Sequence, residues 1–270
     1  MAVYFLGCDM GGWHTKKGDA LAVCKWSEGC LEPVGEDLQP GSFFYPCAEG
    51  GPVVRVLRQA LAEDSQIVIG IDGALAWPTA FADLVLAAPR AEVSAQFQCA
   101  DGCLSNPILY RETERFIGKR VLKPGDRPLS AVGDKFGNNS SKTQALVSWF
   151  STRLPEMYRP PFDKWDTNTA RAAKYSLIEV YPKASMKCRR FADLAWPGGS
   201  LTMSQHGKSD RDDAKRAAMT AVCYAAAVGI IPGATEYPAM LTPDDGIRAG
   251  ACEEHLVTKE GWIFCPCDRE

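Results

Sequence analysis

The sequence lacks an apolar run long enough to cross a bilayer. Its longest such run, residues 217–231, is shorter than the roughly 20 residues that a membrane-spanning helix needs, and it follows a charged cluster. The first residues are apolar for only about eight positions, without a basic lead or a small-residue cleavage site. We therefore expect a cytoplasmic protein with no membrane contact and no secretory signal, in which residues 217–231 form a buried helix.

Histidine is scarce, and the cysteines are not grouped. The three histidines are scattered, and the eleven cysteines include no C-x-x-C pair. The closest pairs, Cys99/Cys103 and Cys265/Cys267, have no second pair at the spacing of zinc ligands, which argues against a structural zinc site. An odd number of cysteines, several of them inside apolar runs, favours packed, reduced thiols over a disulfide framework.

The charge of the chain is small overall but unevenly distributed. Residues 111–190 contain seventeen Lys and Arg against eight Asp and Glu, whereas the rest contains thirteen against twenty-five, and the whole chain has a net charge of −3. A basic segment in an acidic protein is typical of a polyanion-binding face. If these charges are instead paired in space, the segment is only a solvated surface, and the sequence leaves both interpretations open.

Two apolar runs each end on an aspartate, one at residues 4–9 and one at residues 67–72. Each run predicts a buried strand that delivers a carboxylate to its carboxyl end, where open α/β sheets bind ligands. Between them, strands are expected at 20–26 and 30–34, with a turn at 27–29, and the helical spacing of apolar residues predicts a helix at 53–63. The resulting β-β-β-α-β order opens the ribonuclease-H-like fold, in which the fourth strand lies parallel beside the first.

Beyond residue 72 the pattern becomes mixed. Residues 73–175, with a Gly/Asn/Ser-rich loop at 133–142 and a proline-rich loop at 155–161, are interpreted as an inserted cap or substrate arm. A strand at 176–182, a helix at 184–194 and a long helix at 212–231 follow. The expected fold is thus α/β, with a ribonuclease-H-like mixed sheet flanked by helices, a core of 1–72 and 176–270, and a long insertion after the fourth strand.

Six strings resemble the successive signatures of one family. They are GCDMGG, IGIDGALAWP, YRETERF, IEVYPKAS, DRDDAKRAAMTAVCYAAA and EGWIFCP, and they occur in this order between residues 4 and 266. The family is catalogued as domain of unknown function 429, and its members are described as predicted nucleases of ribonuclease-H-like fold. The resemblance implies that fold and a metal-dependent hydrolysis of phosphodiester bonds, while the family's physiological substrate is unsettled.

The resemblance also implies a set of site residues. The resemblance implies that Asp9, Asp72, Glu179 and Asp213 are catalytic. Glu179 would be either a metal ligand or a neighbour of the metal ligands. Holliday-junction resolvases of this fold have a second acid three residues after the helix acid, where this chain has Arg216. Asp210 stands three residues before Asp213 on the same helical face, so the expected metal ligands are Asp9, Asp72, Asp213 and Asp210.

Physical chemistry gives these acids a reason to converge. Phosphodiester hydrolysis with two divalent ions needs several carboxylates from different elements, and oxygen ligands suit Mg²⁺ or Mn²⁺. Simpler interpretations stay open as well. An Asp-Gly pair at a strand end is often a turn, the acids at 210, 212 and 213 could cap a helix, and Glu179 could pair with an arginine.

Substrate contacts are expected in the basic segment. Arg111 and Glu114 could contact the substrate or form a salt bridge on a helix surface, and Lys119, Arg120 and Lys123 are expected to follow the phosphate backbone of DNA or RNA.

Two rival functions stay open. The opening residues also look like the phosphate-binding hairpin of actin-like ATPases and small-molecule kinases, but no D-x-G-x-G-T string follows residue 150. A non-catalytic nucleic-acid-binding or scaffold protein is the second rival, and metal-dependent cleavage would argue against it. The sequence gives no indication of the oligomeric state.

Overall fold

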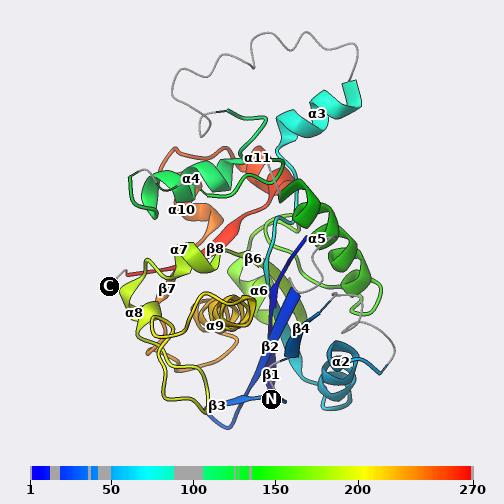
Figure 1. Cartoon of the computed structure of the whole chain (residues 1–270), viewed down its shortest axis with the longest axis vertical. Helices are drawn as coiled ribbons and strands as arrows, with labels where there is room; N and C mark the ends of the chain where they lie inside the picture. Colours follow the sequence, from blue (N-terminus) through cyan, green and yellow to red (C-terminus); the bar gives the residue numbers. More distant parts are fainter. Residues whose placement is uncertain are drawn as a thin grey trace.

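A mixed β-sheet forms the centre of the protein, and helices flank it (Figure 1). The computed structural model describes residues 2–12, 19–35, 38–41, 50–87, 106–124, 126, 128–133 and 136–268. The strands follow the order β3-β2-β1-β5-β6-β8-β7, and β4 pairs with β2 off this path. Strand β1 (Val3–Asp9) thus lies inside the sheet, between β2 (Asp19–Ser27) and β5 (Gln66–Asp72).

The direction of the strands changes at β1. Strands β1, β2 and β3 (Cys30–Pro33) form an antiparallel meander, and β4 (Leu38–Gly41) is also antiparallel to β2. Strands β1, β5, β6 (Tyr175–Val180) and β8 (Ile263–Cys267) are parallel to one another, whereas β7 (Ala239–Leu241) is antiparallel to β8. The carboxyl ends of β1, β5 and β6 therefore point to the same edge of the sheet.

Each face of the sheet packs against its own helices. Val3 and Phe5 of β1 face a cluster built around α9 (Asp210–Val228), while Tyr4 and Leu6 face a second cluster. That second cluster contains side chains from α2 (Pro52–Ala62) and α5 (Phe136–Ser151). The alternation of side chains along a strand thus separates two hydrophobic cores.

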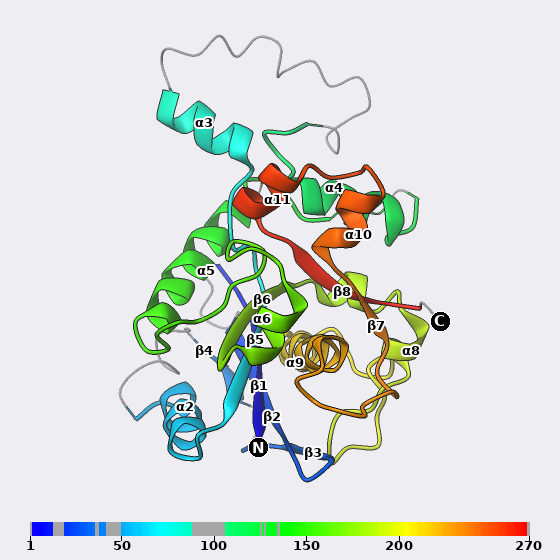
Figure 2. The ribbon, with the colours of Figure 1, turned by 180° about the vertical axis from the view of Figure 1, so that it is seen from behind.

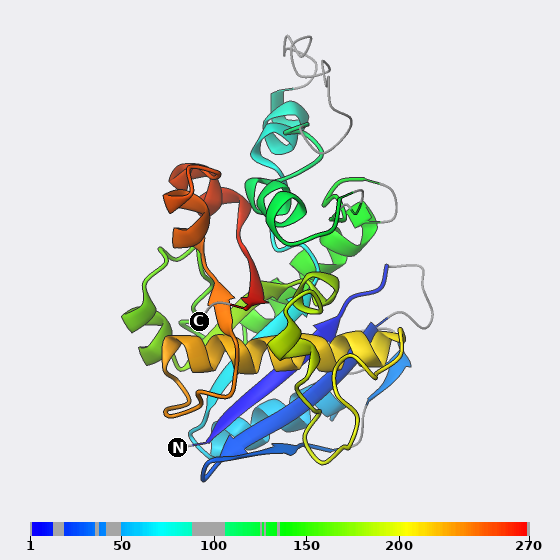
Figure 3. The same cartoon turned by 90° about the vertical axis from the view of Figure 1, so that its left-hand side faces the viewer.

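Helix α9 lies across the strands of the sheet in close contact with them (Figure 3). Two glycines make the approach possible, because a Cβ atom on Gly7 would lie 2.1 Å from the Ala214 carbonyl oxygen and one on Gly70 would lie 2.7 Å from the Ala217 carbonyl oxygen. Gly7 and Gly70 are directly opposite one another in the β1–β5 pairing. The helix therefore rests on a flat site that spans two strands.

The remaining helices lie mostly beyond the carboxyl ends of β1 and β5. Helices α3 (Thr79–Ala87), α4 (Glu112–Arg120), α10 (Pro243–Arg248) and α11 (Glu254–Glu260) gather there (Figure 2). Along the chain, the short helix α6 (Thr167–Ala172) precedes β6, and the short helices α7 (Pro182–Ser185) and α8 (Arg189–Ala192) follow it. In the part of the chain that is described, no helix is both long and apolar enough for a bilayer.

The sequence-based elements agree with the structure in the first half of the core. Strands at 3–9, 20–26, 30–34 and 67–72 and a helix at 53–63 are all present to within one or two residues. The long C-terminal helix begins two residues earlier than expected, at Asp210, and ends at Val228, where Gly229 adopts a left-handed φ of 78°. Most of its apolar side chains are buried, as expected.

Two predicted elements are wrong. The expected loop at 133–142 is helical from Phe136 onward, and the expected helix at 184–194 is divided into α7 and α8. The division has a tertiary cause, because Asp268 at the other end of the chain accepts hydrogen bonds from the backbone N–H groups of Arg189 and Arg190 and thereby caps α8.

The segment 73–175, predicted as an inserted cap or substrate arm, contributes to the core. Leu146 and Phe150 of α5, followed by Leu154, belong to the same buried cluster as Tyr4 and Leu6 of β1. The second half of this segment therefore covers one face of the sheet.

Candidate functional site

Two aspartates meet at the carboxyl ends of β1 and β5. Asp9 and Asp72 are opposite one another in the parallel pairing, two residues beyond the paired Gly7 and Gly70. Adjacent strands are about 4.8 Å apart, so the two residues are immediate neighbours. The expectation that the first strand and strand 67–72 are parallel neighbours is confirmed.

Both aspartates face the side of the sheet that α9 covers. Side chains two residues apart share a face, so Asp9 lies on the face of Gly7, and Asp72 lies on the face of Gly70, where α9 packs. The repeated Gly-x-Asp pattern thus brings the helix close to the sheet and places a carboxylate beside its N-terminal turn. There α9 adds Asp213 and Asp210 to the same cavity.

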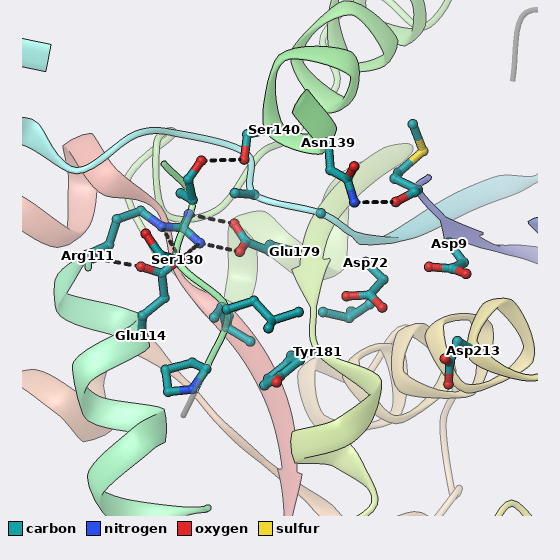
Figure 4. Close-up of a pocket in the computed structure, with 18 of the residues that line it drawn as sticks. Asp9, Asp72, Arg111, Glu114, Ser130, Asn139, Ser140, Glu179, Tyr181 and Asp213 are labelled. Carbon is teal, nitrogen blue, oxygen red and sulfur yellow. Dashed lines mark hydrogen bonds and ion pairs between the residues drawn. The ribbon is translucent and has the colours of Figure 1, made fainter. Parts of the chain in front are cut away.

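The cavity beside these carboxylates has a volume of about 240 Å³. Its walls come from the ends of β1, β5 and β6, the N-terminal part of α4, residues 128–131, the first turns of α5 and the first turn of α9. Figure 4 shows Asp9, Asp72 and Asp213 on one side of this space and Arg111 with Glu114 on the other.

The aspartates at the strand ends hold their protons unusually tightly. Burial raises the pKa of Asp9 to about 9, and the charges of Asp72, Asp213, Asp210 and Asp19 act in the same direction. Burial also raises the pKa of Asp72 well above its ordinary value, with Asp213 and Glu179 adding to the effect. Both shifts are typical of crowded carboxyl groups, and no opposite charge among the described residues lowers either pKa.

The acids of α9 have different environments. Asp213 forms an ion pair with Arg216, with 2.7 Å between Arg216 Nη1 and Asp213 Oδ1. Arg216 also donates hydrogen bonds to the carbonyl oxygens of Met203, His206 and Gly207. Asp212 turns away to cap the helix through Ser209 and does not line the cavity. Of the three neighbouring acids, Asp210 and Asp213 therefore lie at the site, and Asp212 has the capping role.

The carboxylate oxygens at the cavity are of the kind that binds a hard divalent cation, but they are not grouped as closely as the ligands of a bound metal ion. Within the described ranges, no three His, Cys, Asp or Glu side chains are grouped closely enough to hold a metal ion as they stand. The carboxylates that face the cavity offer only oxygen ligands, which suit Mg²⁺ or Mn²⁺. A cation would also neutralise the repulsion that raises the pKa of Asp9 and Asp72.

Glu179 is engaged elsewhere. Its two carboxylate oxygens accept hydrogen bonds from Arg111 Nη1 at 2.8 Å and Arg111 Nη2 at 2.5 Å, and Oε2 also accepts one from the backbone N–H of Leu75 at 3.0 Å. Strand alternation places Glu179 on the face opposite to Val180, which packs in the α9 cluster. The structural pair with an arginine, one of the two interpretations of the sequence, is thus present.

Arg111 and Glu114 are fully buried. Arg111 is 1% exposed and Glu114 is 2% exposed, and their ion pair is 2.9 Å long. Burial lowers the pKa of Arg111, but the charges of Glu114 and Glu179 raise it by more, so Arg111 keeps its charge. Arg111 is also paired with Glu179 and so joins the start of α4 to β6 inside the protein, whereas the sequence suggested either a substrate contact or a surface salt bridge for Arg111 and Glu114. Both residues do line the cavity.

The other expected substrate contacts lie outside the cavity. Lys119, Arg120 and Lys123 are exposed at the end of α4 and just beyond it, and Arg120 borders a separate hollow beside β7 and β8. Since a helix rises 1.5 Å per residue, they are on the order of 12 Å from the N-terminus of α4 along its axis.

Many charges of the basic segment are paired in space. The ion pairs are Arg111 with Glu179, Arg115 with Glu112, Lys142 with Asp19, Arg159 with Asp163, Lys174 with Asp64, and Lys183 and Lys187 with Asp126. Most of these acids belong to the segment itself, and among the described ion pairs only Lys142 with Asp19 and Lys174 with Asp64 use acids from other parts of the chain, so the excess of positive charge is reduced only slightly.

Sequence reasoning missed several residues at the site. Tyr181 lines the cavity directly after β6, and Asn139 holds the start of α5 to the end of β1 by donating to the Met10 carbonyl at 3.0 Å. A buried ion pair between Lys142 and Asp19 lies nearby, 2.5 Å long. Tyr181 lies two residues after Glu179 in IEVYP, so its position next to a predicted site residue could have indicated it. Asn139 and Lys142 lie in a stretch that was interpreted as a loop.

Most cysteines of the described ranges lie in the two hydrophobic cores. Six are buried, namely Cys8, Cys24, Cys188, Cys223, Cys252 and Cys265, and the pair Cys99/Cys103 lies outside the described residues. The expectation that most cysteines are packed is confirmed at these six positions, whereas Cys30 is exposed.

A scan against protein-family models found no match, and searches of curated proteins and of solved structures found none either.

Proposed function

We propose that this protein is a metal-dependent nuclease with a ribonuclease-H-like core, related to the family that its sequence resembles. The observation that carries the proposal is the convergence of Asp9, Asp72 and Asp213 from three elements on one cavity, with the pKa of Asp9 raised to about 9. Crowded carboxylates such as those of Asp9 and Asp72 reduce stability, so a role that uses their charge explains their position. Buried thiols suit a reducing compartment, which supports a cytoplasmic location.

The topology supports the fold assignment. An antiparallel meander, a crossover helix and a parallel strand beside the first strand occur in the order that the ribonuclease-H-like fold requires. The long helix α9 then covers the face on which both aspartates lie.

The residues of the cavity would have different roles in the proposed reaction. Asp9, Asp72 and Asp213 would hold Mg²⁺ or Mn²⁺, with Asp210 at the edge of the set. When bound, the metal supplies charge neutralisation at the phosphate and activation of the attacking water. Arg216 holds the Asp213 carboxylate in place and ties it to the loop at 203–207. The ion-paired Glu179 supports the wall of the cavity through Arg111.

The test combines metal binding with cleavage. We expect Mn²⁺ alone to raise the melting temperature of the purified protein, because a ligand that binds only the folded state stabilises it by mass action. The Asp9→Asn variant should lose this shift and the Mn²⁺-dependent cleavage of labelled single-stranded, duplex, hybrid and branched substrates. Asp193→Asn, which changes an exposed aspartate outside the cavity, is the matched control and should behave like the unmodified protein.

Each rival function predicts a different result. A shift with ATP and Mg²⁺ but none with Mn²⁺ would favour the actin-like ATPase or kinase. Nucleic-acid binding without cleavage under any metal would favour a non-catalytic binding protein. Either result would overturn the proposed nuclease.

A further inference from the structure

The cavity ends at a wall whose charged groups are already bonded to one another. The Arg111 guanidinium donates to Glu114 and Glu179 and to the Glu260 carbonyl oxygen, at distances of 2.5 to 3.1 Å. Arg111, Glu114 and Glu179 are all less than 5% exposed. A polynucleotide that enters past the aspartates therefore cannot continue through this wall (Figure 4).

The charges along the cavity determine which part of a nucleotide fits each end. Arg111 is the only basic residue among the described lining residues, and it is shared by two carboxylates, so the wall offers no free positive charge to a phosphate. The aspartate end is the part that could receive a phosphate together with a cation. The wall end thus suits the uncharged sugar and base.

The size of the cavity limits the ligand to one unit. Pockets for drug-sized ligands have volumes of roughly 300–1,000 Å³. The volume bounded by the described residues is about 240 Å³, which suits one nucleoside and not a base pair or two stacked nucleotides.

Tyr181 is the side chain best placed to contact such a unit. Tyr181 lines the cavity between the wall and the aspartates, where it is 8% exposed and packs against the core around α9, and its hydroxyl has no hydrogen-bond partner among the described residues. The hydroxyls of Ser130 and Ser140, which also line the cavity, already donate to the carbonyl oxygens of Leu109 and Ala131. An aromatic ring with a free hydroxyl can stack on a base and donate to it.

We propose that the cavity binds one unpaired terminal nucleoside of a nucleic-acid strand against Tyr181, so that cleavage starts from an end. This proposal rests on the proposed nuclease function. It adds the form of the substrate, which the aspartates alone do not determine.

A binding experiment tests the pocket without any cleavage. Thymidine 5′-monophosphate contains no phosphodiester bond, so its affinity in the presence of Mg²⁺ can be measured by calorimetry. We expect one site per chain, with affinity about fivefold weaker in Tyr181→Phe, which loses one hydrogen bond, and at least tenfold weaker in Tyr181→Leu, which loses the ring. Tyr237→Phe and Tyr237→Leu, at a tyrosine outside the cavity, are the controls, and melting curves verify that each variant folds.

Absence of binding by the unmodified protein, or unchanged affinity in Tyr181→Leu, would overturn the proposal.

A cleavage experiment separates this proposal from the proposed function. Linear and circular single strands of the same sequence, as DNA and as RNA, are incubated with the protein and Mn²⁺. We expect linear strands to be shortened from an end and circles to stay intact. Equal cleavage of circles would overturn end recognition while upholding the nuclease. Absence of any cleavage, together with no Mn²⁺ shift in melting temperature, would overturn both.

Discussion

A buried carboxyl group beside other carboxyl groups keeps its proton to a higher pH, and Asp9 is such a group. Its ordinary pKa of 3.8 is raised to about 9 in the folded protein. Between these values the unfolded chain has released the proton that the folded chain still holds. Folding therefore takes up a proton in this range, and the free energy of unfolding falls as the pH rises.

This sign gives a prediction for the metal-free protein. From pH 5 to pH 8, in the presence of a chelator, stability should fall with pH, with a slope of up to about 1.4 kcal/mol per pH unit for each proton taken up. Asp9→Asn removes the titrating group, so its slope should be smaller and its stability at pH 8 higher. Urea unfolding at several pH values measures both. An Asp9→Asn protein with the slope of Asp193→Asn would contradict the assignment.

Arg111 gives a second prediction at the scale of single residues. Arg111→Met would leave Glu114 and Glu179 buried without their charged partner, and breaking a buried ion pair in this way costs about 3–5 kcal/mol. Arg115→Met removes a partly exposed partner of Glu112 on the same helix and should cost about 1 kcal/mol or less. Denaturant unfolding compares the two, and equal losses would show that the buried network contributes little.

Sequence reasoning reached some of these residues and not others. Asp9 and Asp72 could be found because each ends an apolar strand, and strand neighbours share an edge. The face of the sheet on which Glu179 lies could also be predicted, because the alternation of side chains along the strand places Val180, not Glu179, on the face of α9. Its partner Arg111 lies 68 residues away in the sequence, so no local pattern could pair them.

At the scale of elements, the Gly-x-Asp pattern of β1 and β5 positions α9. A Cβ atom at Gly7 would lie 2.1 and 2.2 Å from backbone atoms of Ala214 and Ala218, so the helix would have to move. We expect Gly7→Ala to destabilise the protein by about 3 kcal/mol and to abolish the melting-temperature shift with Mn²⁺, because Asp213 moves with the helix.

Gly70→Ala, whose closest backbone contact would be 2.7 Å, should have a smaller effect. Gly199→Ala is the control, because its Cβ would be 3.3 Å from the Trp196 carbonyl oxygen and its backbone is not left-handed. Thermal melting with and without Mn²⁺ measures both properties. A Gly7→Ala protein as stable as Gly199→Ala would disprove the close packing.

The elements that the sequence failed to predict depend on distant contacts. Helix α5 begins in a run of Gly, Asn and Ser that favours loops, but its apolar side chains farther along pack on the sheet. Strand β8 contains Pro266 and is only five residues long, and its place in the sheet comes from pairing with β6 and β7. Local propensity is a weak guide where tertiary packing decides the outcome.

At the scale of the whole molecule, the charge distribution limits where a polynucleotide could lie outside the cavity. Many basic residues of the segment 111–190 are paired, whereas Lys119, Arg120 and Lys123 are exposed. If they hold the phosphates of a single strand, reversing all three to Glu should make the plot of log affinity against log salt shallower by about 2. Fluorescence anisotropy over a range of salt concentrations measures the slope.

Reversing Arg153, Lys164 and Lys174 is a control with the same change in charge in other parts of the segment. These three lie after α5 and around α6, away from the cavity lining. If both triple variants change the slope equally, or neither does, the end of α4 is an ordinary solvated surface.

The central position of β1 also determines when the site can form during synthesis. Asp9 is made first, yet Asp213 follows it by 204 residues, which takes roughly 10 to 40 seconds at the usual rate of translation. Until α9 has left the ribosome, Gly7 and Gly70 have no helix to cover them, and the face that carries both aspartates is open to water. A chain cut short before α9 would therefore lack both the site and the cover of its first strand, so the carboxylates can be brought together only after α9 has been synthesised.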